Sequence, residues 1–146
     1  MSYPIPRLRI AAGLAVLALG AVACGGDDAD QATVDTTEVA ASSRLLGVDE
    51  FADFLDTTPS AVLVNVHIPY EGHLDGTDAY VPFDEIGTSD GLPADRDAPI
   101  ALYCRSGSMS AQATATLLDL GYTNVVDLDG GMNAWTATGN KLLTNR

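Results

Sequence analysis

A single cysteine stands where a strand, a loop of small residues and a helix are expected to meet. Cys104 follows the apolar run 100–103, and a helical pattern covers residues 110–120. The intervening loop consists of Arg105, Ser106, Gly107, Ser108 and Met109. Backbone N–H groups of such a loop can turn inward and bind an anion, and the N-terminus of the following helix adds partial positive charge. Both effects favour the thiolate, the nucleophilic form of cysteine, so Cys104 is the candidate nucleophile.

Other interpretations of the same loop imply different chemistry. A lone cysteine is most often a small buried hydrophobe, but an apolar core gives no reason for Arg105 and several serines to crowd just beyond a strand. Cysteine phosphatases use a similar loop with an arginine six residues after the cysteine, which clamps the oxyanion. Ser110 holds that position here, which argues against a phosphatase. A module in which Cys104 carries sulfur, senses redox state or binds a partner without turnover remains an open alternative.

The elements that must position this loop alternate along the chain. Apolar runs predict buried strands at 61–66, 100–103 and 125–128. Helical spacing of large apolar residues predicts three helices: one after Asp49, one over 110–120, and a short one that contains Met132 and Trp135. Alternating strands and helices predict an α/β fold with parallel strands. Ligand sites of such sheets lie at the carboxyl ends of the strands, where Cys104 is expected.

Several motifs in this region resemble one protein family. The cysteine loop looks like the active-site loop of the rhodanese (thiosulfate sulfurtransferase) family: Tyr103-Cys104-Arg105-Ser106-Gly107. The family's closing motif is closely matched by Leu128-Asp129-Gly130-Gly131-Met132-Asn133-Ala134-Trp135. Residues 63–66 and 70–73 resemble its opening strand and the glycine–histidine turn that follows. The resemblance spans residues 46–139 and implies a rhodanese-like α/β fold, a mostly parallel five-stranded sheet flanked by helices on both faces.

The resemblance also implies a chemistry. In this family the loop thiolate attacks the outer sulfur of a donor such as thiosulfate or a persulfide, and a persulfide remains on the cysteine. A thiol or cyanide then accepts that sulfur, without a metal or another cofactor. Carried over to this chain, Cys104 is the nucleophile and sulfur carrier. The N–H groups that would hold the persulfide charge belong to the cradle Arg105, Ser106, Gly107, Ser108 and Met109.

Four positions depart from the family pattern. The opening strand usually ends in Asp-Val-Arg, whereas this chain has Asn65 and His67 at the first and third places. The turn has Asp75 where the family has proline, and the sixth loop position is Met109 rather than a basic or hydroxyl side chain. An apolar rim at Met109 would suit a donor with less charge than thiosulfate, such as a low-molecular-weight persulfide. His67 is expected to line the pocket mouth and His73 to be a structural turn residue, since the two lack the further ligands of a metal site.

The first 23 residues are predicted to be a lipoprotein signal peptide. Arg7 and Arg9 precede an uncharged apolar run of 14 residues, shorter than the roughly 20 that a membrane span needs. The small residues just before Cys24 resemble the lipobox of bacterial lipoproteins, in which the cysteine is lipidated. Cleavage without lipidation and an uncleaved anchor are the alternatives. Lipidation predicts an exported protein that is anchored in the cell membrane, with its domain outside the cytoplasm.

Composition separates the rest of the chain into two parts. Residues 24–43 are small, polar and acidic, which predicts a flexible tether after the lipidated cysteine. Residues 44–146 are long enough for one domain, the rhodanese-like domain of this prediction. A formal net charge of −13 excludes a nucleic-acid partner, because phosphate binding needs clustered basic side chains. The two cysteines allow at most one disulfide, and none if Cys24 carries lipid.

Overall fold

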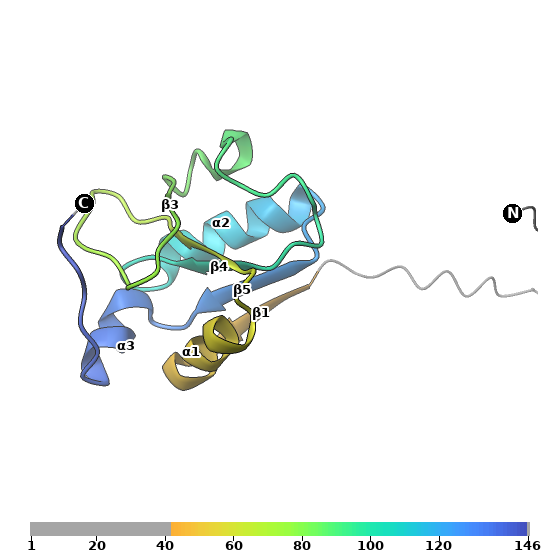
Figure 1. Cartoon of the computed structure of the whole chain (residues 1–146). Helices are drawn as coiled ribbons and strands as arrows, with labels where there is room; N and C mark the ends of the chain where they lie inside the picture. Colours follow the sequence, from red (N-terminus) through yellow and green to blue (C-terminus); the bar gives the residue numbers. More distant parts are fainter. Residues whose placement is uncertain (1–41, 146) are drawn as a thin grey trace, which may run out of the picture. The chain divides into compact units, whose positions relative to one another are not determined.

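A computed structural model describes residues 42–145, which form a parallel sheet with helices on both faces (Figure 1). The strand order is β1-β5-β4-β2-β3, and every pair of neighbouring strands is parallel. In chain order the elements are β1 (Ser42–Leu46), α1 (Val48–Thr57), β2 (Val62–Asn65), β3 (Ala79–Tyr80), η1 (Ile86–Thr88), β4 (Ile100–Tyr103), α2 (Ser108–Asp119), β5 (Asn124–Leu128) and α3 (Gly131–Ala137). The predicted five-stranded α/β fold is confirmed.

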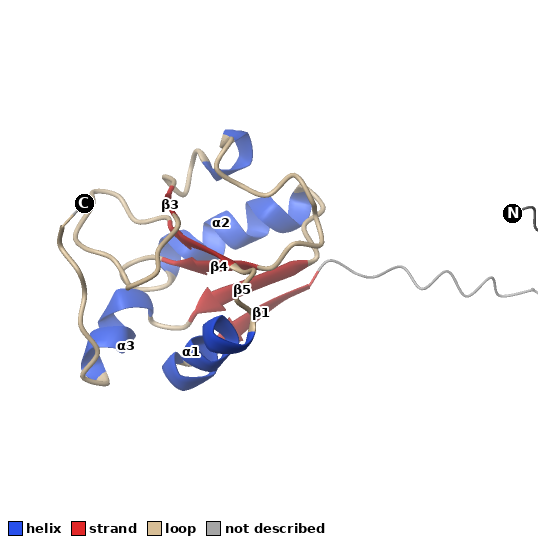
Figure 2. Ribbon diagram, in the orientation of Figure 1, coloured by secondary structure: helices blue, strands red, loops and turns tan. Residues whose placement is uncertain are grey.

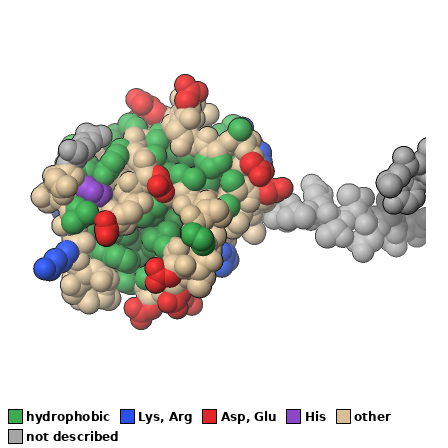
Figure 3. Space-filling view, in the orientation of Figure 1, with side chains coloured by type: hydrophobic (Ala, Val, Ile, Leu, Met, Phe, Trp, Pro, Cys, Tyr) green, Lys and Arg blue, Asp and Glu red, His purple; other side chains and the backbone are tan. Residues whose placement is uncertain are grey.

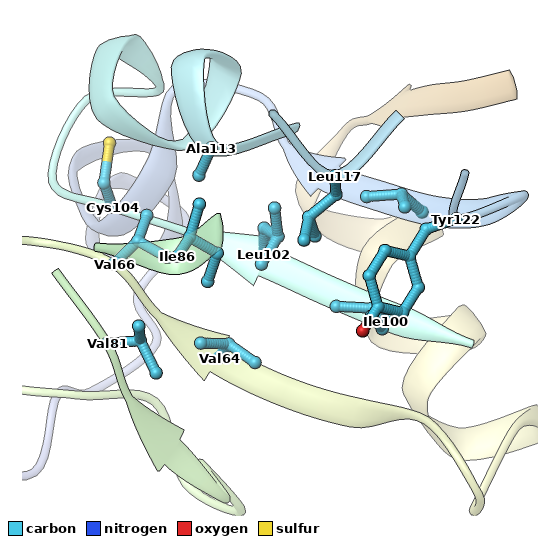
Figure 4. Packing of buried hydrophobic residues seen from close by; sticks show 11 residues of the cluster. Val64, Val66, Val81, Ile86, Ile100, Leu102, Cys104, Ala113, Leu117 and Tyr122 are labelled. Atoms are coloured by element: carbon cyan, nitrogen blue, oxygen red, sulfur yellow. The ribbon is translucent and has the colours of Figure 1, made fainter. Parts of the chain in front are cut away.

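The two faces of the sheet bury separate apolar clusters. Side chains alternate along a strand, so Ile100 and Leu102 of β4 point to one face, and Ala101 and Tyr103 point to the other. Helix α2 and η1 cover the first face, and α1 and α3 cover the second (Figure 2). Figure 4 shows the first cluster, which runs along the sheet beneath α2 and ends at Cys104. The core therefore extends up to the candidate nucleophile.

The edge strand β1 was not predicted from the sequence. Its residues are mostly exposed, and they show no apolar alternation that would mark a strand. Main-chain pairing with β5 holds it in place from Ser42 to Leu46. The folded domain therefore begins before the predicted boundary at Arg44, and Ser42 and Ser43 belong to the sheet rather than to the tether. The rest of the tether, Cys24 and the signal peptide lie outside the described residues.

Helix α2 begins two residues earlier than predicted. Gly107, its N-cap, has a φ of +91°, a left-handed conformation that glycine adopts without a steric penalty. This turn leads the chain directly from the loop into the helix, so Ser108 and Met109 lie in the first helical turn. The loop after Cys104 is correspondingly short. In the part of the chain that the structure describes, no helix is long and apolar enough to cross a membrane.

Acidic side chains dominate the charged groups on the face of the molecule in Figure 3. This agrees with 20 acidic against 7 basic residues in the chain. Arg44 and Arg96 place their guanidinium groups over the rings of Phe54 and Tyr122. Two of the basic side chains are thus engaged with neighbouring aromatic rings.

Candidate active site

Cys104 lies directly after β4, with 1 % of its surface exposed. Its sulfur is near the N-terminus of α2 at the end of the buried cluster (Figure 4). The Gly107 N–H donates to Cys104 Sγ over 3.1 Å, and the Ser110 hydroxyl donates to the same sulfur over 3.5 Å. Cys104 carries a free thiol. Two donors aimed at one sulfur stabilise its anionic form, as the loop composition predicts.

The start of α2 supplies further polar groups beside this sulfur. The first N–H groups of an α-helix have no acceptor within the helix, and the helix dipole places partial positive charge there. Residues 108–110 form this first turn, and the N-cap Gly107 is itself bonded to the sulfur. The Ser110 hydroxyl also lies 3.1 Å from the Gly107 carbonyl oxygen, which ties the helix back to the loop. The Cys104 sulfur therefore lies at the positive end of α2.

The closing motif positions the loop from the other side. The Met132 N–H donates to the Cys104 carbonyl over 2.9 Å, and the Asn133 N–H donates to the Arg105 carbonyl over 3.0 Å. Because a trans peptide points its C=O and N–H in opposite directions, the N–H groups of Arg105 and Ser106 point away from α3. The hydrogen bonds from the first turn of α3 thus hold the loop so that the Arg105 and Ser106 N–H groups face away from α3.

Gly131 makes this close approach feasible. It has a φ of +57°, and a Cβ built on it would lie 2.3 Å from the Cys104 carbonyl oxygen, far inside van der Waals contact. Any larger residue must push α3 away from the loop. The two glycines of the closing motif thus have a physical explanation, since Gly130 is also left-handed and its Cβ would meet Ala134.

A chain of side chains crosses the rim of the site. Arg105 Nη1 lies 3.3 Å from Glu71 Oε1, and Glu71 Oε2 lies 3.2 Å from His67 Nε2. The other ring nitrogen of His67, Nδ1, contacts Met109 Sδ at 3.3 Å. The His67 side chain, with 7 % of its surface exposed, therefore lies against the unusual Met109. A cavity of about 110 Å³ opens beside it, lined by Asn65, His67, Ile68, Tyr70, Tyr80, Val81 and Pro82.

The remaining departures from the family pattern lie at two different places. Asn65 is buried at the end of β2, where its amide donates to the Gly72 carbonyl over 2.9 Å and its side-chain oxygen accepts the His67 N–H over 2.9 Å. The uncharged Asn65 amide therefore holds the turn between His67 and Gly72 in place through these two hydrogen bonds. Asp75 lies in an exposed turn, bonded to the Gly76 N–H and away from the rim residues.

His73 is a buried turn residue, as expected. It accepts or donates a 2.7 Å hydrogen bond with the Tyr70 hydroxyl, and its backbone pairs with Leu143. Met132 is buried in the core, and Trp135 packs against the same cluster. Among residues 42–145, no group of three or more His, Cys, Asp or Glu side chains is placed to hold a metal ion.

Sequence reasoning missed three residues of this site. In the sequence Ser110 stands out only as the residue that replaces a phosphatase arginine, yet its hydroxyl donates to Cys104 Sγ. Glu71 matched the family turn without a role, and the structure places it between Arg105 and His67. Asp127 looks like any surface acid in the sequence, but it is buried in β5. An aspartate inside a run of buried strand residues is the one signal that could have indicated it.

The model of the rhodanese-like domain family matches residues 38–138. The chain belongs to this family. A probable adenylyltransferase/sulfurtransferase, MoeZ, from Mycobacterium tuberculosis is 35 % identical over 120 residues, which are 77 % of this chain and 28 % of MoeZ. The thiosulfate sulfurtransferase GlpE of Pseudomonas fluorescens is 34 % identical over 79 residues, 53 % of this chain and 72 % of GlpE. The chain thus spans little more than a quarter of the length of MoeZ.

Solved structures agree with the fold. A rhodanese-related protein from Thermoplasma volcanium has a TM-score of 0.57 at 23 % identity, covering 70 % of this chain and 99 % of that one. A rhodanese-like domain protein from Staphylococcus aureus has a TM-score of 0.55 at 23 % identity, with 70 % and 99 % covered. The described residues therefore share the fold of these rhodanese-like proteins.

Substituting Gly131 tests whether the contact between α3 and the loop supports the fold. We expect Gly131→Ala to lower the free energy of unfolding by about 2–5 kcal/mol, because a left-handed alanine adds backbone strain and its methyl group overlaps the Cys104 carbonyl. Gly139→Ala is the matched control: Gly139 is also left-handed, but nothing lies within 4 Å of its Cβ position. We expect the control to lose about 1–2 kcal/mol in urea unfolding. Equal losses in the two variants would contradict the contact.

Proposed function

We propose that this protein is a sulfurtransferase that carries sulfane sulfur as a persulfide on Cys104. The observation that carries the proposal is the setting of Cys104 Sγ, which accepts hydrogen bonds from the Gly107 N–H and the Ser110 hydroxyl at the start of α2. The family membership and the relatives named as sulfurtransferases support it. Cys104 is the free thiol of the described residues, so a sulfur carrier has one clear candidate.

The proposed cycle has two substitutions at sulfur. The Cys104 thiolate attacks the outer sulfur of the donor, the donor's sulfur–sulfur bond breaks, and the leaving group departs with the electron pair. With thiosulfate the leaving group is sulfite; with an organic persulfide it is a thiolate. The outer sulfur of the resulting Cys104 persulfide is then attacked by a thiol or cyanide, and Cys104 leaves as the thiolate. The loop N–H groups stabilise the anion at both stages.

The rim favours a donor with little charge over thiosulfate. Thiosulfate is a dianion, and recognition of such oxyanions relies on available cationic or hydroxyl side chains. Here the Arg105 guanidinium is paired with Glu71, and Met109 places a thioether at the sixth loop position. We therefore propose a low-molecular-weight organic persulfide as the donor, rather than thiosulfate.

The near-complete burial of Cys104 favours one second candidate. A cysteine residue that is 1 % exposed would accept sulfur slowly and hold it, without passing it to small acceptors. Such a protein would be a non-catalytic or redox-sensing binding module.

The place of action is proposed from the sequence. The signal-like segment 1–23 and the cysteine that follows it support export and lipidation at Cys24, with residues after it serving as a tether. The domain would then act on the outer side of a cell membrane, where small sulfur compounds reach it.

Sulfur loading followed by mass spectrometry tests the function. We expect the purified protein to gain the mass of one sulfur atom on the peptide that contains Cys104 after incubation with cysteine persulfide or thiosulfate. The added sulfur should be lost to cyanide with formation of thiocyanate. Cys104→Ala should abolish both steps, whereas Cys24→Ala, which leaves Cys104 as the remaining cysteine, should keep them. Loading without transfer would support the binding module, and no loading from any donor would refute the enzyme.

Substituting Glu71 tests whether the site prefers an organic persulfide to thiosulfate as the sulfur donor. We expect Glu71→Gln to raise kcat/KM for thiosulfate about threefold to tenfold, because it releases the Arg105 guanidinium beside the site, while kcat/KM for an uncharged organic persulfide stays the same. Asp75→Asn removes one negative charge in an exposed turn and serves as the matched control. Steady-state assays at low ionic strength measure both. A wild type that already uses thiosulfate faster than organic persulfides, or an equal gain from the two variants, would contradict the proposed donor.

Membrane fractionation tests the lipid anchor. In bacterial cells that express the full chain, we expect the protein in the membrane fraction and processed at Cys24. Cys24→Ala, or treatment with globomycin, should prevent lipidation and leave an unprocessed precursor. Retention of a processed protein in the membrane after either change would reject the assignment.

A further inference from the structure

The cavity beside the cysteine loop has no role in the sulfur-transfer cycle above. Its volume is about 110 Å³, and its lining comes from the end of β2 with the turn after it, and from the end of β3 with the two residues after it. Strand β2 lies between β3 and β4 in the sheet, and all three strands are parallel. The cavity therefore opens at the carboxyl edge of the sheet, where parallel sheets bind ligands and where Cys104 follows β4.

Three contacts place this cavity next to the nucleophile. The Val66 N–H donates over 3.0 Å to the carbonyl of the last residue of β4, which directly precedes Cys104. His67 lines the cavity and also contacts Met109 Sδ at 3.3 Å, so one side chain borders both the cavity and the loop. Val81, another lining residue, belongs to the same buried cluster as Cys104 (Figure 4). The cavity is thus a space into which the organic part of a donor can extend while its sulfur reaches the loop.

The polar side chains of the cavity wall are already engaged within the protein. The Asn65 side chain bonds backbone groups through both its nitrogen and its oxygen. One ring nitrogen of His67 contacts Glu71 and the other contacts the Met109 thioether, while the Tyr70 hydroxyl forms a 2.7 Å hydrogen bond with a neighbouring histidine. In the part of the chain that the structure describes, the wall contains no lysine, arginine, aspartate or glutamate. A charged substituent would lose water here without gaining a partner.

The rest of the wall is apolar and encloses a small space. Ile68, Val81 and Pro82 contribute aliphatic surface, and the rings of Tyr70 and Tyr80 meet edge to face with their centroids 5.7 Å apart. A dry protein cavity of roughly 150 Å³ holds a benzene molecule. By that measure a cavity of about 110 Å³ suits an alkyl group of about four carbon atoms.

A segment outside the family match holds one wall of the cavity in place. Tyr70 bonds His73, and the backbone of His73 exchanges two hydrogen bonds with Leu143, of 2.9 and 2.8 Å. Leu143 follows residue 138, where the match to the rhodanese-like model ends. A wall that is already fixed costs little further ordering when a ligand binds.

We propose that this cavity binds the organic substituent of the persulfide donor and selects a small, uncharged alkyl group. This choice of substituent rests on the proposed function of Cys104. In the loading step Cys104 Sγ forms a bond to the donor's outer sulfur, and the donor's own sulfur–sulfur bond breaks. The alkyl thiolate leaves with the electron pair and takes a proton from water. Glutathione persulfide, whose substituent carries carboxylates and an ammonium group, fits this cavity poorly.

A series of alkyl persulfides tests the selection. We expect kcat/KM for sulfur transfer to cyanide to rise about threefold to fourfold with each CH₂ group from methyl to butyl, because each group leaves water. Longer chains extend beyond the cavity, so the rise should level off. Simple alkyl thiolates are similar leaving groups, so the dependence on length reports binding. Butyl persulfide should exceed glutathione persulfide by about tenfold or more. No dependence on length, or a preference for glutathione persulfide, would overturn the proposal.

Ile68→Lys tests the same selection from the side of the protein, with Leu120→Lys as the matched control. The two native side chains are 37 % and 40 % exposed, and each change adds one positive charge, but Leu120 lies at the end of α2 and does not line the cavity. We expect Ile68→Lys to lower kcat/KM for butyl persulfide about tenfold and to raise it for glutathione persulfide about threefold. Leu120→Lys should leave both values within about twofold. Equal changes in the two variants would contradict binding at the cavity.

A binding measurement on the wild type separates this proposal from the sulfurtransferase itself. Butane-1-thiol, the product of loading from butyl persulfide, should shift the amide NMR signals of residues 65–68, 70, 80 and 81 in a saturable way. Loading of sulfur without these shifts would overturn the role of the cavity and leave the sulfurtransferase intact. No loading from any donor would instead refute the sulfurtransferase, and the donor role of the cavity with it.

Discussion

Two hydrogen bonds from the first turn of α3 to the carbonyls of Cys104 and Arg105 determine how the site is built. With these carbonyls directed at α3, peptide planarity directs the following N–H groups away from it. The same arrangement leads the chain into the left-handed Gly107 and the start of α2, where the helix dipole adds positive charge. The sheet places β4 and β5 side by side, so the loop after one strand meets the helix after the other. The two donors to the sulfur, the Gly107 N–H and the Ser110 hydroxyl, both lie where this loop enters α2.

The charge balance around the sulfur distinguishes this protein from a simple anion cradle. Uncharged dipoles hold the sulfur from the inside, because the Gly107 N–H and the Ser110 hydroxyl are its direct donors. At the rim the Arg105 cation is opposed by Glu71, which also contacts His67. Behind the sulfur lies the buried Asp127 carboxyl, whose pKa burial raises to about 6. These features suit a site that stabilises one negative charge on the Cys104 sulfur and attracts a further anionic group only weakly.

The sequence predicted the fold best where a residue type has a single structural role, such as apolar side chains that must be buried. The layers of the fold were predicted from the apolar runs at 61–66 and 100–103 and from the helical spacing of apolar residues around Phe51. Buried strands and amphipathic helices each require their own spacing of apolar residues, so the sequence reveals them. The cysteine loop and the paired glycines predicted that Cys104 lies between the end of β4 and the start of α2. Edge strand β1 could not be predicted, since main-chain pairing holds it and leaves its side chains free to be polar. Ser110 and Glu71 could not be assigned from the sequence, because their contacts with Cys104 and Arg105 arise only when the loop folds. The burial of Asp127 had one local signal, its place inside a run of buried strand residues.

A crystal structure of the protein after reaction with an organic persulfide tests most directly whether the loop holds an anionic sulfur. We expect one additional sulfur bonded to Cys104 Sγ, within hydrogen-bond reach of the N–H groups of residues 105–109. The bonds from Met132 and Asn133 to the loop carbonyls should be unchanged. A loop that has turned its carbonyls toward the sulfur, or a Cys104 that remains unmodified at saturating donor, would contradict the role assigned to this junction.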